Sequence, residues 1–300
     1  MRGNKKKILV LSGGGAHTVT YLGVWQFIHE KIYREGEIDE RYIPDYIVGT
    51  SGGALFGCFM AARKNGRLLS GREIKEELIK QKPWKLVSIN AIEKLINLFS
   101  WGLIDIKRIR RRIKSVLEEY NIDWNTFTKP KYECVVTNLT EGKRQYIPTD
   151  SAMDLDAAIT ASITVPGIFT PLWYSTGSKV EKHCYVDGGV CEGFPVKAAL
   201  RMGRENVKIM AISPFSEPKC HDIDRLKQYL MAIFHTLLDS KQEDMRSLLS
   251  EDHGDIHLVT GSFASSLLDF RLTTINKNYD RGYEIAQENE EKITKFFVEE

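Results

Sequence analysis

Short runs of β-branched and apolar residues alternate with stretches of helical periodicity along most of this chain. Six runs predict buried strands, at residues 8–11, 46–48, 133–137, 185–187, 207–212 and 256–260. Helical patterns separate most of them; one has its apolar residues on a single helix face, at Ile109, Ile113, Val116, Leu117 and Tyr120. Strands that alternate with helices form mostly parallel sheets covered on both faces. The sequence therefore predicts an α/β fold, with three α/β/α layers around a mostly parallel central sheet.

The 300 residues show no internal repeat, low-complexity segment or linker, so we expect a single domain over residues 1–300. Right-handed crossovers bring the carboxyl ends of parallel strands to one edge of a sheet. Open sheets of this kind bind their ligands at that edge. We therefore expect the functional residues directly after strands.

Composition and charge are those of an ordinary globular protein. Hydrophobic residues make up 42% and charged residues 27%, and a net charge of +2 gives no reason to expect a nucleic-acid partner. The five cysteines are odd in number and fit no zinc pattern, so we expect reduced thiols and a cytoplasmic location. The apolar run at 8–11 is too short for a signal peptide, and no 18-residue apolar window predicts a membrane span.

The segment 82–106 fits the alternation least well. It is rich in apolar residues and contains Trp84, Phe99 and Trp101. A pair of core helices would account for this content, and so would a lid or membrane-facing insertion, because long connections are often functional. In the second interpretation the aromatic rings enter the headgroup zone. An anionic lipid surface is then contacted by the basic residues Arg108, Arg111, Arg112 and Lys114.

The sequence Gly49-Thr50-Ser51-Gly52-Gly53 is the strongest indicator of chemistry. It follows the strand at 46–48 and precedes an apolar helix start, which is the context of a G-x-S-x-G nucleophile elbow. Glycines flank the serine because side chains there would clash with the neighbouring strand and helix. The turn raises the Ser51 hydroxyl above the sheet edge, where the positive helix end favours developing negative charge. A glycine-rich turn that merely contains a serine is the alternative.

A second glycine-rich turn, Ser12-Gly13-Gly14-Gly15-Ala16, separates the first strand from the next helix. Its N–H groups would form a nest for an anion, either a phosphate or the oxyanion of acyl transfer. The dinucleotide pattern fails because Thr18 stands at its third glycine, and the Walker pattern is absent. Beside a nucleophile elbow, the oxyanion interpretation is the more economical one.

A third motif, Tyr185-Val186-Asp187-Gly188-Gly189, ends a strand with an aspartate. The strand end is expected to place Asp187 on the same sheet edge as Ser51. Taken alone, an Asp-Gly-Gly sequence is also an ordinary turn.

Together these residues resemble the patatin-like phospholipase family. Its motifs are a glycine-rich oxyanion loop, G-x-S-x-G, a later Ala-Ser-x-x-x-Pro, and Asp-Gly-Gly/Ala. All four occur here in order within residues 8–196, as Gly13-Gly14-Gly15, Gly49 to Gly53, Ala161-Ser162-Ile163-Thr164-Val165-Pro166 and Asp187-Gly188-Gly189. The resemblance implies the three-layer α/β/α fold, a Ser–Asp dyad, an acyl-enzyme, and lipid or ester substrates.

The expected reaction starts with attack of Ser51 on an ester carbonyl while Asp187 accepts its proton. The candidate oxyanion donors are the N–H groups of Gly13, Gly14, Gly15 and Gly52. No metal or cofactor is expected, and the expected partners are a lipid or ester substrate and, peripherally, a membrane.

The chain departs from the family beside its oxyanion loop. Where the family usually continues with a basic residue and a glycine, this sequence has His17 and Thr18. Thr18 would be strained if the position required a positive φ. Protonated His17 would replace the family's cation at lower pH, or it would simply be a helix N-terminal residue that faces solvent.

Two other functions remain open at this stage. A conventional Ser–Asp–His triad would recruit a histidine downstream of Asp187, and His221, His235, His253 and His257 are available. Alternatively, the chain is a non-catalytic membrane- or partner-binding module on the same fold, which the altered loop at His17 and Thr18 would favour.

Overall fold

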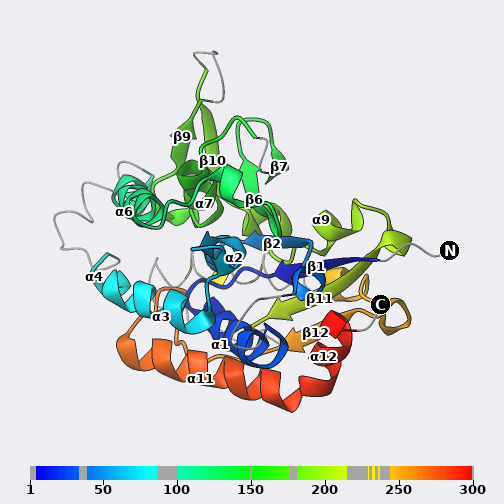
Figure 1. Ribbon diagram of the computed structural model, residues 1–300. Coiled ribbons are helices and arrows are strands. Elements are labelled where there is room, and N and C mark those ends of the chain that lie inside the picture. Colours follow the sequence, from blue (N-terminus) through cyan, green and yellow to red (C-terminus); the bar gives the residue numbers. More distant parts are fainter. Residues whose placement is uncertain are drawn as a thin grey trace.

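The computed structural model describes residues 5–33, 39–86, 101–148, 151–175, 181–214 and 244–298, together with 229, 232, 233 and 236. These residues form a central sheet flanked by helices (Figure 1). The strands of this sheet are β1 (Lys6–Leu11), β2 (Tyr46–Thr50), β6 (Lys131–Asn138), β7 (Lys143–Ile147), β9 (Leu172–Tyr174), β10 (His183–Asp187), β11 (Val207–Ser213) and β12 (Ile256–Val259). All six predicted strands are therefore present.

The strand order is β12-β11-β1-β2-β6-β10-β9, with β7 paired to β6 outside this path. The ladders from β12 to β6 are parallel, and β10, β9 and β7 join antiparallel. Two short ladders lie apart from the sheet, formed by β3 (Arg63–Lys64) with β4 (Arg67–Leu68) and by β5 (Gly102–Ile104) with β8 (Gly167–Phe169). The prediction of a mostly parallel central sheet is confirmed.

Alternate residues of β1 enter two different hydrophobic cores. Leu9 and Leu11 belong to the larger core, whereas Ile8 and Val10 belong to a smaller core on the other face. A strand buried on both faces is what a near-continuous apolar run predicts. This arrangement gives the three α/β/α layers expected from the sequence.

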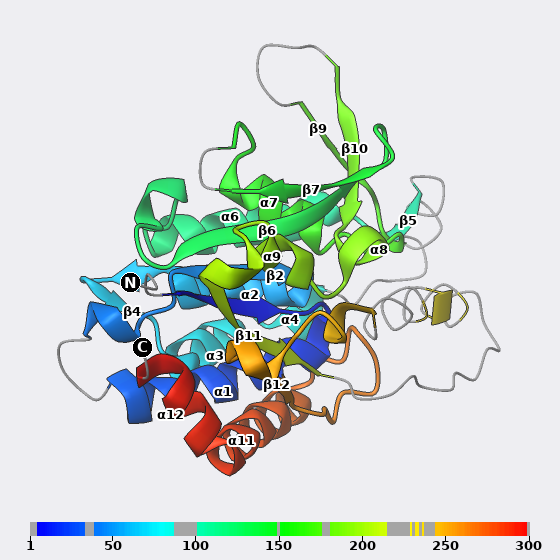
Figure 2. The same cartoon turned by 90° about the vertical axis from the view of Figure 1, so that its right-hand side faces the viewer.

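The helices divide between these faces. Described α-helices are α1 (Thr20–Ile28), α2 (Gly52–Ala61), α3 (Gly71–Lys80), α4 (Pro83–Leu86), α6 (Ile106–Glu119), α7 (Leu155–Ser162), α8 (Gly189–Glu192), α9 (Val196–Leu200), α11 (Leu272–Glu288) and α12 (Glu290–Val298). Short helical turns are η1 (Gly15–Val19), η2 (His29–Tyr33), η3 (Glu40–Tyr42), η4 (Trp124–Thr126), η5 (Arg204–Asn206) and η6 (Glu251–His253). Helices α1 and α11 lie side by side in the larger core (Figures 1 and 2), while α9 packs in the smaller one.

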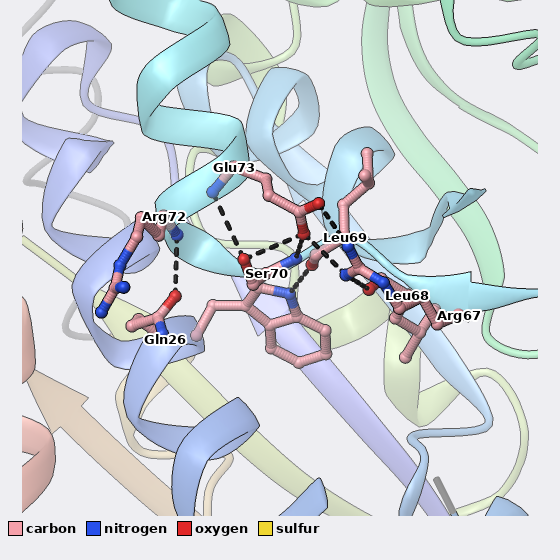
Figure 3. Close-up of polar contacts among 8 residues, drawn as sticks. Gln26, Arg67, Leu68, Leu69, Ser70, Arg72 and Glu73 are labelled. Atoms are coloured by element: carbon pink, nitrogen blue, oxygen red, sulfur yellow. Dashed lines mark hydrogen bonds and ion pairs between the residues drawn. The ribbon is translucent and has the colours of Figure 1, made fainter. Parts of the chain in front are cut away.

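Helix α3 is fixed at its first turn by a set of polar contacts (Figure 3). Ser70 and Glu73 form a reciprocal capping box, which satisfies N–H groups that a helix start leaves without partners. Arg67 donates two hydrogen bonds to the Glu73 carboxylate, at 2.6 and 2.8 Å, and holds the pKa of Glu73 at about 2. The Arg72 N–H donates to Gln26 Oε1 at 2.8 Å, which ties α3 to α1. These contacts hold in place a helix that forms one wall of the cavity described below.

The direction of β10 differs from the simplest reading of the sequence. The strand runs antiparallel to β6, and Asp187 pairs with Val136. Strand β2 runs parallel to β6, and Thr50 pairs with Val135 one residue earlier. The carboxyl ends of β2 and β10 therefore approach the same level of β6 from opposite directions. This arrangement places Asp187 beside the elbow.

No helix in the described part of the chain combines the length and apolarity that crossing a membrane requires. Of the predicted lid segment 82–106, residues 87–100 lie outside the described residues.

Candidate active site

Ser51 lies on a strained turn between β2 and α2. Its backbone has φ 55° and ψ −126°, a conformation that side-chain-bearing residues rarely adopt. Such a conformation costs on the order of 1–3 kcal/mol and persists only where the surroundings enforce it. Gly52 permits the turn, because a Cβ there would lie 2.3 Å from Thr18 Oγ1 and 2.8 Å from the Gly15 carbonyl. The motif therefore forms the strand–turn–helix elbow that the sequence predicts.

Ser162 holds the strained residue in place. Its hydroxyl accepts a hydrogen bond from the Ser51 N–H at 3.0 Å and donates one to the Val135 carbonyl at 2.7 Å. All three residues are buried, so neither bond is exchanged for one with water. Ser162 belongs to the Ala-Ser-x-x-x-Pro sequence; the pattern singled it out, but its contacts with the elbow come from 111 residues away in the chain.

Asp187 meets the serine at the end of β10. The Ser51 hydroxyl donates a hydrogen bond of 2.7 Å to Asp187 Oδ2, and the Gly189 N–H donates one of 2.7 Å to Oδ1. The backbone of Asp187 is fixed as well, since its N–H donates to the Thr164 carbonyl and its carbonyl accepts from Thr137 Oγ1. Both carboxylate oxygens are thus oriented without a third titratable side chain.

Burial gives the Asp187 carboxyl group an unusually high pKa. Asp187 is 0% exposed, and Ser51 is 3% exposed. Desolvation raises the pKa of Asp187 to about 7, although the hydrogen bonds from Ser51 and Gly189 lower it in part. A carboxyl group with a pKa near 7 is a much stronger base than an ordinary aspartate, and it still releases its proton near neutral pH.

The glycine-rich loop lies directly against the elbow. Gly14 has φ 156° and Gly15 has φ 54°, and a Cβ at Gly15 would lie 2.4 Å from the Leu267 carbonyl. Gly15 opens η1 and Gly52 opens α2, so helix geometry leaves their N–H groups without an intrahelical acceptor. Within the described residues, the N–H groups of Gly14, Gly15 and Gly52 have no hydrogen-bond partner.

Gly13 differs from the other candidate donors. Its N–H donates to the Gly193 carbonyl at 2.7 Å, so it is already used in the structure. The expectation that Gly13 supplies an oxyanion donor is therefore not met in this conformation; it anchors the loop to the segment after α8. The N–H groups of Gly14, Gly15 and Gly52 remain as candidate donors.

An apolar cavity of about 170 Å³ opens from these groups. Gly15, Ser51 and Gly52 line one part of it. The rest is walled mainly by apolar side chains of α2, α3, α6 and a loop near residue 268, including Leu55, Phe59, Ile74, Ile113, Val116 and Leu268. A mostly apolar cavity with a few convergent polar groups is the usual form of a small-molecule site.

The sequence model of the patatin-like phospholipase family matches residues 9–200, which is more than half of the chain. The chain belongs to the patatin-like phospholipase family. The matched region contains the elbow, the glycine-rich loop, Ser162 and Asp187. Membership in this family supports a lipid hydrolase.

The chain is similar to the uncharacterised protein YqhO of Bacillus subtilis, with 22% identity over 89% of this chain and 91% of that protein. Two solved structures are more distant. VipD from Legionella pneumophila has 16% identity and a TM-score of 0.46, covering 95% of this chain and 66% of that one. ExoU, in its complex with SpcU from the type III secretion system of Pseudomonas aeruginosa, has 14% identity and a TM-score of 0.40, covering 98% and 52%. The chain thus spans less than two-thirds of either of these two proteins.

The two departures from the patatin-like pattern take different places. Thr18 lies within η1 and is absent from the positive-φ residues, so the expectation of strain is wrong; its hydroxyl donates to the Gly15 carbonyl at 2.6 Å. His17 is 2% exposed, which excludes the alternative that it faces solvent. Its Nδ1 lies 3.0 Å from Ser262 Oγ, and Ser262 contacts Asn278 of α11. His17 therefore links the glycine-rich loop to the C-terminal part of the chain.

The histidines considered for a triad do not meet Asp187 in the described structure. His257 Nε2 lies 2.9 Å from Ser213 Oγ, and burial lowers its pKa to about 4. His253 ends η6, and its carbonyl accepts a hydrogen bond from Lys5. His221 and His235 lie outside the described residues. No group of His, Cys, Asp or Glu in the described ranges could hold a metal ion.

Proposed function

We propose that this chain is a serine acyl hydrolase that cleaves lipid esters with a Ser51–Asp187 dyad. The observation that carries the proposal is the 2.7 Å hydrogen bond between Ser51 Oγ and Asp187 Oδ2. Both residues are buried, and Ser51 lines an apolar cavity. Family membership supports the coarser assignment, a lipid hydrolase. The geometry supports the choice of residues.

The first half of the reaction forms an acyl-enzyme. Ser51 Oγ attacks the ester carbonyl carbon, and its proton passes to the ionised Asp187. The carbonyl oxygen becomes an oxyanion, and the N–H groups of Gly14, Gly15 and Gly52 stabilise it. When the tetrahedral intermediate collapses, Asp187 returns the proton to the departing alcohol. A carboxylate is a weak base for a serine, so the oxyanion donors contribute heavily; one such donor is worth about 3–4 kcal/mol in known enzymes.

The second half releases the acyl chain. Water replaces the alcohol, Asp187 removes its proton, and the resulting attack on the acyl-enzyme repeats the oxyanion step. Collapse of the second intermediate frees the fatty acid and returns the proton from Asp187 to Ser51 Oγ. The sequence of steps uses only the residues of this chain and water.

The cavity supports an acyl chain as the group transferred to Ser51. Apart from Glu77, Gln81 and Arg112, its lining beyond Ser51 and the two glycines is aliphatic and aromatic, which suits a hydrocarbon chain and offers a polar substrate few partners. Lipids with such chains reside in membranes, so we propose peripheral membrane contact as part of the function.

The test is hydrolysis by the purified chain of p-nitrophenyl esters with two to sixteen acyl carbons, and of phospholipids in mixed micelles. We expect turnover by the wild type and none by Ser51→Ala. Absence of turnover with every substrate would favour the alternative of a non-catalytic binding module. Turnover that survives Ser51→Ala would place the nucleophile elsewhere.

A further inference from the structure

A second hollow adjoins the apolar cavity. It has a volume of about 610 Å³ and lies between the α3–α4 segment and α6, which are on the same side of the molecule in Figure 1. The groove is lined by Lys80, Gln81, Lys82, Lys85, Leu86, Arg108, Arg111, Arg112 and Ser115. Gln81, Leu86 and Arg112 also line the cavity that contains Ser51. The groove and the cavity are therefore adjoining hollows with a shared rim.

Helix α6 separates apolar and basic residues onto different faces. Ile109, Ile113 and Val116 are buried and line the cavity. Positions 108, 111, 112 and 115 follow the spacing i, i+3, i+4 and i+7, so they form one stripe, and all four line the groove. The other wall carries Lys82 and Lys85, which are exposed.

The positive charge of this groove is largely uncompensated. Within the described residues, no carboxylate forms an ion pair with Lys82, Lys85, Arg108, Arg111 or Arg112. Three neighbouring basic residues do have acidic partners: Arg110 contacts Asp156, Lys114 contacts Glu118, and Lys80 contacts Glu77 and Glu119. Like charges brought together in a concave surface repel one another and attract an anion.

We propose that this groove binds the phosphate groups of an anionic phospholipid surface, and that lipid reaches the apolar cavity across the shared rim. The first half concerns binding alone, and the second rests on the proposed hydrolase function. A membrane is the fitting partner because the basic groove adjoins an apolar cavity, and an amphiphilic lipid can contact both with its phosphate and its hydrocarbon chain. Trp101, five residues before α6, is 81% exposed, as suits a ring in the headgroup zone.

The experiment is co-sedimentation with vesicles of phosphatidylcholine alone or with 30% phosphatidylglycerol, using the Ser51→Ala protein so that no lipid is consumed. The groove variant is Arg108→Glu with Arg111→Glu. Its matched control is Lys107→Glu with Lys114→Glu, which makes the same charge change at exposed positions of the same helix that do not line the groove. Lys82→Glu with Lys85→Glu tests the opposite wall, and circular dichroism verifies folding of each variant.

We expect the protein to bind the anionic vesicles. Its apparent affinity for them should fall at least about tenfold in the variant of each groove wall and less than about threefold in the control. It should also weaken as salt is raised, because ions screen surface charge. Equal losses in groove and control variants would overturn the proposal, and so would equal binding to both kinds of vesicle or none to either. Saturable binding of inorganic phosphate that displaces the protein from vesicles would identify a free-phosphate site instead.

These measurements can refute the groove proposal and the hydrolase proposal independently of each other. Wild-type protein that hydrolyses soluble esters but ignores anionic vesicles would refute the groove proposal and leave the hydrolase assignment intact. Protein that binds anionic vesicles through the groove but hydrolyses nothing would refute the hydrolase assignment and retain the binding surface.

Discussion

Two parts of the site are built differently: the floor, which is Ser51 with its hydrogen-bond partner Asp187, and the outer wall, which is formed by α3, α4 and α6. On the floor, the N–H and hydroxyl of Ser51 and both carboxylate oxygens of Asp187 form hydrogen bonds within the protein. Both residues are buried. The outer wall lines the cavity mainly with apolar side chains, and its surface carries basic residues that form no ion pair within the described part of the chain. In the proposed function, the floor carries out the reaction and the wall selects the molecules that reach it.

This difference has an energetic side. The floor contains Ser51, whose backbone is strained, and Asp187, whose ionisation is disfavoured by burial, and both features lower stability. The wall buries apolar side chains, and this burial raises the stability of the protein. Changes on the floor should therefore have large effects on chemistry, whereas changes on the wall should alter selection.

The largest effect is expected from Asp187→Asn on the floor. The amide is nearly isosteric but cannot accept the Ser51 proton, so turnover of a soluble ester should fall at least about a thousandfold. Steady-state kinetics on the folded variant measure it. Near wild-type turnover would show that the base lies elsewhere.

The same variant should be more stable than the wild type at high pH. The folded-state pKa of about 7 lies above the ordinary value of 3.8, so this group's favourable contribution is complete below about pH 4 and is lost as pH rises through about 7. Each pKa unit corresponds to about 1.4 kcal/mol, which sets an upper limit of about 4 kcal/mol for the gain at pH 8. Thermal melts should show the advantage at pH 8 and little of it at pH 4.

The next largest effect is expected from a change of pH on the activity of the wild type. Since Asp187 must be ionised to act as base, kcat/KM for a soluble ester should rise about tenfold per pH unit below about pH 7 and level off above it. Rates between pH 5 and 9 measure this. A profile that is flat down to pH 5 would mean that the base is an ordinary carboxylate.

Ser162→Ala should have an intermediate effect. It leaves the buried Ser51 N–H and Val135 carbonyl without their partner, at a cost of about 1–3 kcal/mol, and loosens the elbow. We expect kcat to fall about tenfold. The control is Thr160→Val, which removes a buried hydroxyl of the same helix; among the described residues this hydroxyl donates to the Asp156 carbonyl and forms no hydrogen bond with the elbow. Equal losses of kcat in both variants would assign Ser162 a purely structural role.

The smallest effect is expected on the wall, from Val116→Phe. A larger side chain fills part of the cavity, so the ratio of kcat/KM for a sixteen-carbon ester to that for a four-carbon ester should fall about five- to tenfold. Leu117→Phe is the control, because Leu117 is buried on the same helix but does not line the cavity. An unchanged ratio in Val116→Phe would exclude the cavity as the acyl site.

The sequence predicted the floor better than the wall, and for a physical reason. The Ser51 turn is determined by its own flanking glycines and the strand before it, so five adjacent residues suffice to recognise it. The cavity is assembled from side chains of several helices far apart in the sequence, including Ile74 and Val116, which no local pattern marks as neighbours. Helical periodicity identified the buried face of α6 but not the surface its basic residues share with α4.

Features that depend on distant partners were also missed. The occupied N–H of Gly13 depends on a carbonyl at Gly193, and the burial of His17 depends on Ser262 and α11. Strand direction was a further case: an apolar run predicts β10 but does not say that it runs antiparallel to β6. Strand β7 has mostly exposed or half-buried residues, so its sequence carries no apolar run to predict it.

The central claim is that Ser51 is the nucleophile of a dyad with Asp187, and covalent labelling tests it most directly. The purified chain is treated with a serine-directed fluorophosphonate and the modified peptide is mapped by mass spectrometry. The account predicts a single labelled residue, Ser51, with labelling absent in Ser51→Ala and strongly slowed in Asp187→Asn. Labelling of another serine, or labelling that persists in Ser51→Ala, would contradict it.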